Sequence, residues 1–133
     1  MTKQEKCCGG VIIKDGKVLI VHQDNQVSVF PKGHVEKGES EIETAKREIF
    51  EETGVIAKLD KKFRYEFGYH IEEGDIDKTV VLFLGTVSAS EAKKIRAQEG
   101  EIKEVLWVPI DEVDNILQFP EWKEVWRRIK EDL

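Results

Sequence analysis

The first third of the chain alternates short apolar runs with turn residues. Apolar side chains dominate residues 8–14 and 17–22, and the Asp15-Gly16 pair between them is typical of a tight β-hairpin turn. After a polar loop, residues 27–30 have the composition of a short strand that leads into a loop over residues 31–39. We therefore predict a hairpin followed by a third strand in this part of the chain.

Residues 40–53 carry the end signals of an amphipathic helix. Ser40 is a favourable N-cap, and Glu43 stands three residues later, where a capping box places it. Gly54 can adopt the left-handed conformation that commonly ends helices. The apolar side chains expected to anchor this helix to a sheet are Ile42, Ala45 and Ile49.

The second half of the chain predicts a long hairpin and a last strand. Residues 61–71 and 78–87 have strand character on either side of an acidic turn that contains Gly74, and residues 104–108 form the last strand. The composition of residues 88–99 suits a helix, but we leave this segment open between helix and loop.

The C-terminal segment predicts helical structure. Asp111 is expected to cap a short helix, and residues 120–133 carry apolar side chains at helical spacing. The stripe expected to lie in the core consists of Trp122, Val125, Trp126, Ile129 and Leu133. Together these elements predict an α/β fold, with a mixed β-sheet between helical layers.

Composition limits the functional classes. The 133 residues are 40% hydrophobic and 36% charged, which predicts one soluble domain over residues 1–133. The net charge of -6 disfavours stable binding to nucleic acid. Residues 80–84, the longest apolar stretch, are too short to span a bilayer, and no apolar signal core precedes them, so we expect no membrane association. The adjacent Cys7 and Cys8 make an awkward disulfide, which favours a reducing cytoplasm.

Three glutamates share one face of the helix predicted over residues 40–53. At about 100° per residue, Glu48, Glu51 and Glu52 fall within an arc of about 100°. Because like charges so close together repel, a divalent cation among them is favoured, and Arg47 can pair with Glu51 one turn later. Hard oxygen ligands suit Mg²⁺ or Mn²⁺. The spacing alone also fits a solvated acidic face.

The segment from Gly33 to Val55, GHVEKGESEIETAKREIFEETGV, resembles the Nudix box. The family pattern is Gly, five residues, Glu, seven residues and then Arg-Glu-aliphatic-x-Glu-Glu-x-Gly-aliphatic. Every specified position is matched, with Glu39 as the first glutamate and Arg47 as the arginine. The resemblance implies a Nudix α/β/α sandwich and metal-dependent hydrolysis of a pyrophosphate bond in a nucleoside diphosphate-linked compound.

The same resemblance implies a metal site. Mg²⁺, with Mn²⁺ as a possible substitute, is expected to be held by Glu48 and Glu52, assisted by Glu51 and the carbonyl of Gly33. The ion would polarise a phosphoryl group and lower the pKa of a bound water. Two further residues are expected to position the helix and the loop before it, namely Arg47 and Glu39.

The general base is expected to be Glu51 or Glu101. Glu101 stands six residues before Trp107, a spacing that resembles an additional glutamate of one Nudix branch that binds metal or acts as base. Glu99 is the alternative for that role, and an ordinary solvated loop glutamate is the alternative interpretation of both residues.

The loop sequence narrows the resemblance to one branch of the family. Residues 30–39, FPKGHVEKGE, and the Lys78-Thr79-Val80 run resemble the branch that includes the asymmetrical diadenosine tetraphosphate hydrolases. This implies that Lys32 contacts a phosphate and that Lys78 reaches the polyphosphate chain. An ordinary surface lysine is the alternative for both positions.

The nucleoside contacts are less defined. Ser28 stands where the branch usually has a tryptophan, so we expect loose base selectivity. Tyr65 and Tyr69 lie at period two in the strand predicted over residues 61–71, where either could stack on a base or pack in the core.

The expected substrate is a small nucleoside polyphosphate. The branch implies asymmetrical cleavage of dinucleoside tetraphosphate into a mononucleotide and a nucleoside triphosphate. The alternatives are hydrolysis of nucleoside triphosphates or oxidised nucleotides, of ADP-ribose or of RNA 5′ ends, and a nucleotide-sensing module without catalysis.

Overall fold

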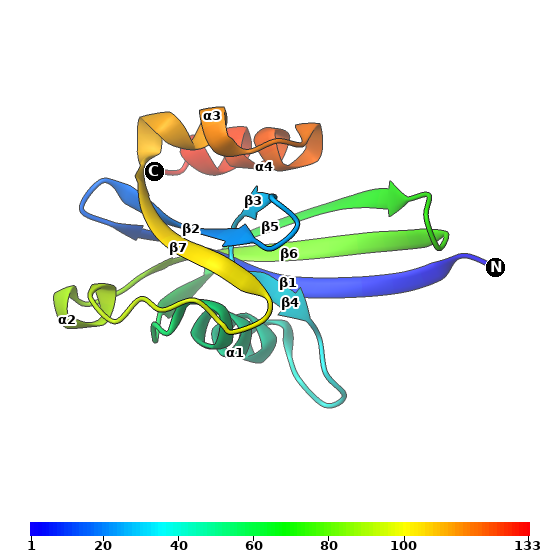
Figure 1. Ribbon diagram of the computed structural model, residues 1–133, viewed down its shortest axis with the longest axis horizontal. Coiled ribbons are helices and arrows are strands. Elements are labelled where there is room, and N and C mark those ends of the chain that lie inside the picture. Colours follow the sequence, from blue (N-terminus) through cyan, green and yellow to red (C-terminus); the bar gives the residue numbers. More distant parts are fainter.

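A seven-stranded mixed sheet lies between two helical layers in the computed structural model, which describes residues 1–133 (Figure 1). The elements in chain order are β1 (Lys3–Lys14), β2 (Lys17–Gln23), β3 (Ser28–Val29), β4 (Lys32–His34), α1 (Glu41–Thr53), β5 (Lys58–Ile71), β6 (Ile76–Thr86), α2 (Ala89–Ala92), β7 (Ile102–Pro109), η1 (Ile110–Glu112), α3 (Val113–Ile116) and α4 (Pro120–Lys130). Figure 1 shows α1 on one face of the sheet and α3 and α4 on the other. The predicted α/β/α architecture is confirmed.

The strand order explains how distant segments meet. The main path is β3-β2-β1-β6-β5, with β4 paired to β1 and β7 paired to β2. Only β1 and β6 run parallel, and all other pairs are antiparallel. β4 therefore enters the sheet beside β1, and the helix that follows it, α1, packs back onto the same strand.

The first hairpin forms as the sequence predicts, but its first strand is longer. Asp15 and Gly16 both have positive φ, 51° and 74°, as a type I′ turn requires. β1 begins at Lys3 rather than at residue 8, because its polar first half pairs with β6 from the Lys3↔Ile76 position onward. Pairing partners far along the chain, rather than apolar content, define this strand.

Helix α1 begins and ends at the predicted signals. The hydroxyl of Ser40 accepts from the backbone N–H of Glu43 at 3.2 Å, and the Glu43 carboxylate accepts from the Ser40 N–H at 2.9 Å. Gly54 has a φ of 83° and donates its N–H to the Phe50 carbonyl. Ala45 and Ile49 are fully buried, so the apolar side of α1 faces the sheet as expected.

Two expectations for the C-terminal region are wrong. Asp111 lies inside the short 3₁₀ helix η1 and makes no side-chain cap. Leu133 is half exposed, because it lies beyond Lys130, where α4 ends. The other members of the predicted stripe are buried, namely Trp122, Val125, Trp126 and Ile129. Residues 88–99, left open above, contain only the four-residue helix α2.

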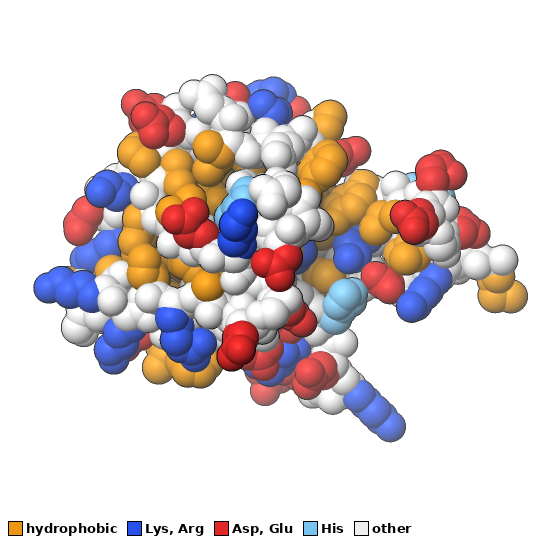
Figure 2. Space-filling view, viewed as in Figure 1, with side chains coloured by type: hydrophobic (Ala, Val, Ile, Leu, Met, Phe, Trp, Pro, Cys, Tyr) orange, Lys and Arg blue, Asp and Glu red, His pale blue; other side chains and the backbone are white.

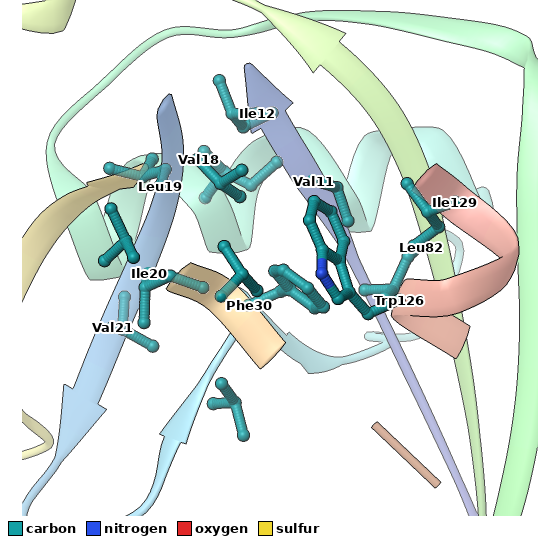
Figure 3. Packing of buried hydrophobic residues seen from close by; sticks show 14 of the residues in the cluster. Val11, Ile12, Val18, Leu19, Ile20, Val21, Phe30, Leu82, Trp126 and Ile129 are labelled. Carbon is teal, nitrogen blue, oxygen red and sulfur yellow. The ribbon is translucent and has the colours of Figure 1, made fainter. Parts of the chain in front are cut away.

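The core under α4 fixes the start of the loop before α1. Figure 3 shows Phe30 and Trp126 pointing toward each other between the sheet and α4. The ring of Phe30 lies 5.8 Å from that of Trp126 and 6.0 Å from that of Trp122, centre to centre. These contacts hold the chain directly before Pro31 and Lys32. None of the helices is both long and apolar enough to cross a membrane.

Candidate active site

A polar cavity of about 370 Å³ lies between β4, α1 and the loop before β7. We call it the acidic cavity, and it is lined by Cys7, Gln23, Lys32, Gly33, His34, Glu36, Arg47, Glu48, Glu51, Glu52, Lys78, Gln98 and Glu101. Figure 2 shows acidic side chains gathered over α1 and the loop before it, with basic side chains among them. The structure thus brings together every residue expected to bind metal.

Gly33 allows α1 to approach β4 closely. An added Cβ at Gly33 would lie 2.1 Å from the carboxyl carbon of Glu48. Backbone pairing of Gly33 with Cys8 holds this part of β4 against β1, so the strand cannot move away freely. The absence of a side chain therefore places the Glu48 carboxylate directly against the Gly33 backbone.

The carboxylates of Glu52 and Glu48 are shielded from water. Glu52 is 5% exposed and accepts a hydrogen bond from the Lys32 backbone N–H at 3.1 Å. Burial raises the pKa of Glu52 to about 8, against the opposing charge of Lys32. Burial also raises the pKa of Glu48, although Arg47 opposes this rise. A positive charge placed in the cavity would therefore stabilise the ionised form of both carboxylates.

The donor set fits a small hard cation. Its oxygen donors are carboxylates, the Gly33 carbonyl and the Gln98 side-chain oxygen, which is buried and has no hydrogen-bond partner. No three acidic, histidine or cysteine side chains lie close enough together to form a complete metal-binding site. A cation with several remaining water or phosphate ligands suits such a site better than one enclosed by protein alone.

Arg47 ties the cavity carboxylates to the loop before α1. Its guanidinium donates to Glu39 at 2.6 Å, to Glu48 at 2.7 Å and to both Glu51 oxygens at 3.2 Å. It also donates to the His34 carbonyl at 2.9 Å. Arg47 and hydrogen bonds from the Glu36 N–H and the Thr44 hydroxyl hold the pKa of Glu39 down at about 2. The predicted Arg47–Glu51 pair is confirmed as one part of this larger network.

The two glutamates considered as general base differ in their contacts. Glu51 is held by Arg47, whereas no side-chain hydrogen bond or ion pair holds the Glu101 carboxylate. The backbone of Glu101 is fixed by the Gln98 carbonyl at 3.4 Å and by the Asp24 N–H at 3.4 Å. Glu99 is exposed and does not line the cavity, so the structure separates it from the other candidates.

A second, larger cavity of about 730 Å³ adjoins the acidic one. We call it the aromatic cavity, and it is lined by Gln23, Asn25, Val27, Val29, Lys32, Tyr69, His70, Ile71, Lys78, Phe119, Pro120, Glu121 and Trp122. The two cavities share Gln23, Lys32 and Lys78. Both lysines expected to contact phosphate thus lie at the boundary between an acidic and an aromatic site.

Tyr65 and Tyr69 have different environments, although both share one face of β5. Tyr69 lines the aromatic cavity. Tyr65 is 8% exposed, and its hydroxyl donates to Asp132 at 2.6 Å. The end of the chain after α4 covers Tyr65, whereas Tyr69 lies near the start of α4, so only Tyr69 is placed to stack on a ligand.

Sequence reasoning missed part of the aromatic cavity. Phe119 is 46% exposed and lines it, and Trp122, expected only as a core residue, contributes to the same wall. An aromatic residue directly before the helix-starting Pro120 is a signal that could have drawn attention to Phe119. Ser28 is not among the lining residues, and it bonds His22 at 3.0 Å.

A family model described as NUDIX domain matches residues 8–130 of the chain. The chain belongs to the Nudix family. It is a Nudix pyrophosphohydrolase, and its Nudix box coincides with β4, α1 and the loop between them. Nudix hydrolases as a family use divalent metal ions.

Named relatives within the Nudix family differ in the substrate that their names give. A mouse protein named bis(5'-nucleosyl)-tetraphosphatase, asymmetrical, is 31% identical over 135 residues, covering 89% of this chain and 88% of the mouse protein. A Bacillus subtilis protein named ADP-ribose pyrophosphatase is 30% identical over 120 residues, covering 86% of this chain and 62% of that protein. The solved binary complex of a C. elegans Ap4A hydrolase has a TM-score of 0.84 at 20% identity and covers 96% of both chains, which shows a shared fold.

Proposed function

We propose that this Nudix pyrophosphohydrolase uses Mg²⁺, with Mn²⁺ as a substitute, to cleave dinucleoside tetraphosphate asymmetrically into a mononucleotide and a nucleoside triphosphate. The observation that carries this proposal is the pair of adjoining cavities that share Lys32 and Lys78. A metal–phosphate site beside an aromatic nucleoside site, with cations between them, suits a substrate with a long phosphate chain. The similarity to the mouse asymmetrical tetraphosphatase supports the same choice.

The acidic cavity supplies the groups for pyrophosphate hydrolysis. When bound, a divalent cation supplies polarisation of the phosphoryl group and activation of water. Glu48, Glu51, Glu52 and the Gly33 carbonyl would hold it. Arg47 orients Glu48 and Glu51 through its hydrogen bonds, and Glu39 holds Arg47 from the other side.

Glu101 is the proposed general base. A water attacks a phosphorus atom, the bond to the bridging oxygen breaks, and the carboxylate takes the proton of the attacking water. Glu101 suits this role because its carboxylate carries no hydrogen bond from another side chain, whereas Arg47 occupies that of Glu51. The two fixed backbone bonds of Glu101 hold the residue at the cavity wall.

The substrate's outer parts are assigned to the shared and aromatic walls. Lys32 and Lys78 neutralise phosphates beyond the reach of the metal site, since an ammonium follows phosphate oxygens without requiring bidentate geometry. Tyr69, Phe119 and Trp122 provide apolar faces for one nucleoside. Because base-stacking contacts alone discriminate weakly, adenosine and guanosine forms are expected to react at rates within about tenfold.

Product chromatography tests the proposal. The purified protein with Mg²⁺ is incubated separately with diadenosine and diguanosine tetraphosphate, ADP-ribose, nucleoside triphosphates including oxidised guanosine forms, and 5′-triphosphorylated RNA. We expect a mononucleotide and a nucleoside triphosphate as the products of the dinucleoside compounds. Symmetric products, or a higher kcat/KM for any other substrate, would assign the protein to another Nudix activity.

The cytoplasmic location expected from the sequence stays a prediction.

A further inference from the structure

Lys78 lies in a row of three side chains across the sheet. On β6 it pairs in register with Glu5 of β1 on one side and with Tyr69 of β5 on the other. Paired residues on neighbouring strands point to the same face of a sheet. The Glu5 carboxylate therefore stands beside Lys78 on the side opposite Tyr69.

Glu5 joins Lys78 to His34 of β4, within the Nudix box. One Glu5 oxygen lies 3.6 Å from Lys78 Nζ and 3.2 Å from His34 Nε2, and the other lies 3.2 Å from Lys3 Nζ. The side chains of Glu5 and Lys78 are only 17% and 13% exposed. Glu5 lines neither cavity, so it acts on a bound ligand only through its neighbours.

Lys78 needs a partner because it borders a cavity with several carboxylates. Its ammonium sits on a flexible four-carbon stem, and the acidic cavity offers Glu48, Glu52 and Glu101 as competing partners. A lysine drawn into that cavity would neutralise groups proposed to bind metal and would leave the boundary with the aromatic cavity. The pair with Glu5 is the single ion pair that Lys78 makes in the structure.

We propose that Glu5 is a positioning residue that holds the Lys78 ammonium at the junction of the two cavities, where it meets the phosphate chain of the substrate. The proposal rests on the proposed function in its choice of ligand. Its effect falls on binding of the polyphosphate and not on the chemical step, since Glu5 contacts none of the groups proposed to react.

A double-mutant cycle tests this role. The probe is a methylene-bridged, non-hydrolysable dinucleoside tetraphosphate with Mg²⁺, and its Kd is measured calorimetrically for wild type, Glu5→Gln, Lys78→Ala and the double variant. Glu5→Gln should weaken binding about three- to tenfold, as expected for loss of a partly shielded ion pair, and should leave binding unchanged within about twofold when Lys78 is already alanine. With hydrolysable substrate, Glu5→Gln should raise KM with little change in kcat.

Three variants make the cycle specific. Gln4→Ala is the matched control on the same strand, because it loses a 3.3 Å bond to Asp77 and should bind the probe like wild type. Glu5→Asp keeps the carboxylate but shortens the side chain by one methylene, and like Glu5→Gln it should weaken binding. His34→Ala removes the imidazole that shares a Glu5 oxygen with Lys78, and the Glu5→Gln loss should persist in that background.

An undiminished loss in the Lys78→Ala background would overturn the proposal, as would a loss that disappears only with His34→Ala. Thermal melts identify any variant whose weaker binding reflects unfolding. If Glu5→Gln is unfolded, Glu5→Asp replaces it in the double-mutant cycle. If wild type fails to cleave dinucleoside tetraphosphate asymmetrically, the proposed function falls, but the Kd values of the probe still decide the role of Glu5.

Discussion

The carboxylate of Glu48 occupies the space that a side chain at Gly33 would need, with 2.1 Å between an added Cβ and the Glu48 carboxyl carbon. Gly33→Ala must therefore displace Glu48 or the β4 backbone. A misplacement of about 1 Å can cost about a hundredfold in rate, so kcat/KM should fall by about that factor while circular dichroism stays native. Gly16→Asn is the control, because an added side chain there meets open space and asparagine tolerates the positive φ of 74° at that position. Activity of Gly33→Ala within about threefold of wild type would contradict this role.

Glu48 and Glu52 should behave as a cation site in thermal melts. Excess Mg²⁺ should raise the Tm of wild type, since a ligand at a hundred times its Kd adds about 2.7 kcal/mol of stability, and should barely change that of Glu48→Gln/Glu52→Gln. Without metal the double variant should be no less stable at pH 7, because burial already disfavours charge on both groups and raises the pKa of Glu52 to about 8. Glu72→Gln/Glu73→Gln removes the same charge from an exposed turn as a control. Equal Mg²⁺ shifts in both double variants would place the cation elsewhere.

Glu101→Gln should separate catalysis from metal binding. Loss of a general base lowers kcat by about a hundredfold or more, and the Mg²⁺-induced Tm shift should remain. Glu99→Gln should keep wild-type turnover, because Glu99 lies outside the acidic cavity. Steady-state kinetics of both variants and of Glu51→Gln make the comparison. If Glu51→Gln loses turnover while Glu101→Gln retains it, the base is Glu51.

Lys78→Ala should lower kcat/KM mainly for substrates with long phosphate chains. Loss of a charged hydrogen bond costs about 1.5–3 kcal/mol, or roughly ten- to a hundredfold in kcat/KM. That factor is expected for dinucleoside tetraphosphate, and a smaller one for ADP-ribose, which has only two phosphates. Lys61→Ala, an exposed lysine of β5, is the charge-matched control. An equal loss on both substrates would remove the assignment of Lys78 to the phosphate chain.

Glu41 should stabilise the fold at neutral pH and lose that effect in acid. Its carboxylate accepts two 2.8 Å hydrogen bonds from Arg64 and lies 2.6 Å from Lys6 Nζ, which joins α1 to β5 and β1. Arg64 foremost, with Lys6, lowers the pKa of Glu41 from 4.5 to about 2. Because the folded-state pKa lies below the unfolded value, the stabilisation is complete above pH 4.5 and disappears as pH falls through 2.

The matching variant is Glu41→Gln. Its Tm should be about 1–5 °C below that of wild type at pH 7, and the gap should close on acidification. Thermal melts across this pH range make the measurement, with Glu73→Gln in the exposed turn as control. A gap that stays constant down to the acid limit would mean that the ion pairs of Glu41 are not its cause.

The sequence by itself determined the features that depend on near neighbours. Ser40, Glu43 and Gly54 defined α1 because caps act within one helical turn, and Asp15-Gly16 defined the first hairpin because a turn is closed by its own backbone. The carboxylate face of α1 followed from helical periodicity alone. The family followed from residues 33–55, in which each specified position stands at a fixed spacing.

Only the tertiary structure decided which distant residues share a site. Tyr65 and Tyr69 have the same strand parity, and packing of the chain after α4 on one end of β5 buried the first and left the second at a cavity. Glu101 lines the acidic cavity and Glu99 does not, because the loop before β7 turns between them. Glu5 meets Lys78 through parallel pairing of strands that are 73 positions apart in sequence. Local signals cannot define such contacts, since the alternation of side chains along a strand gives the face but neither the partner nor the element that covers it.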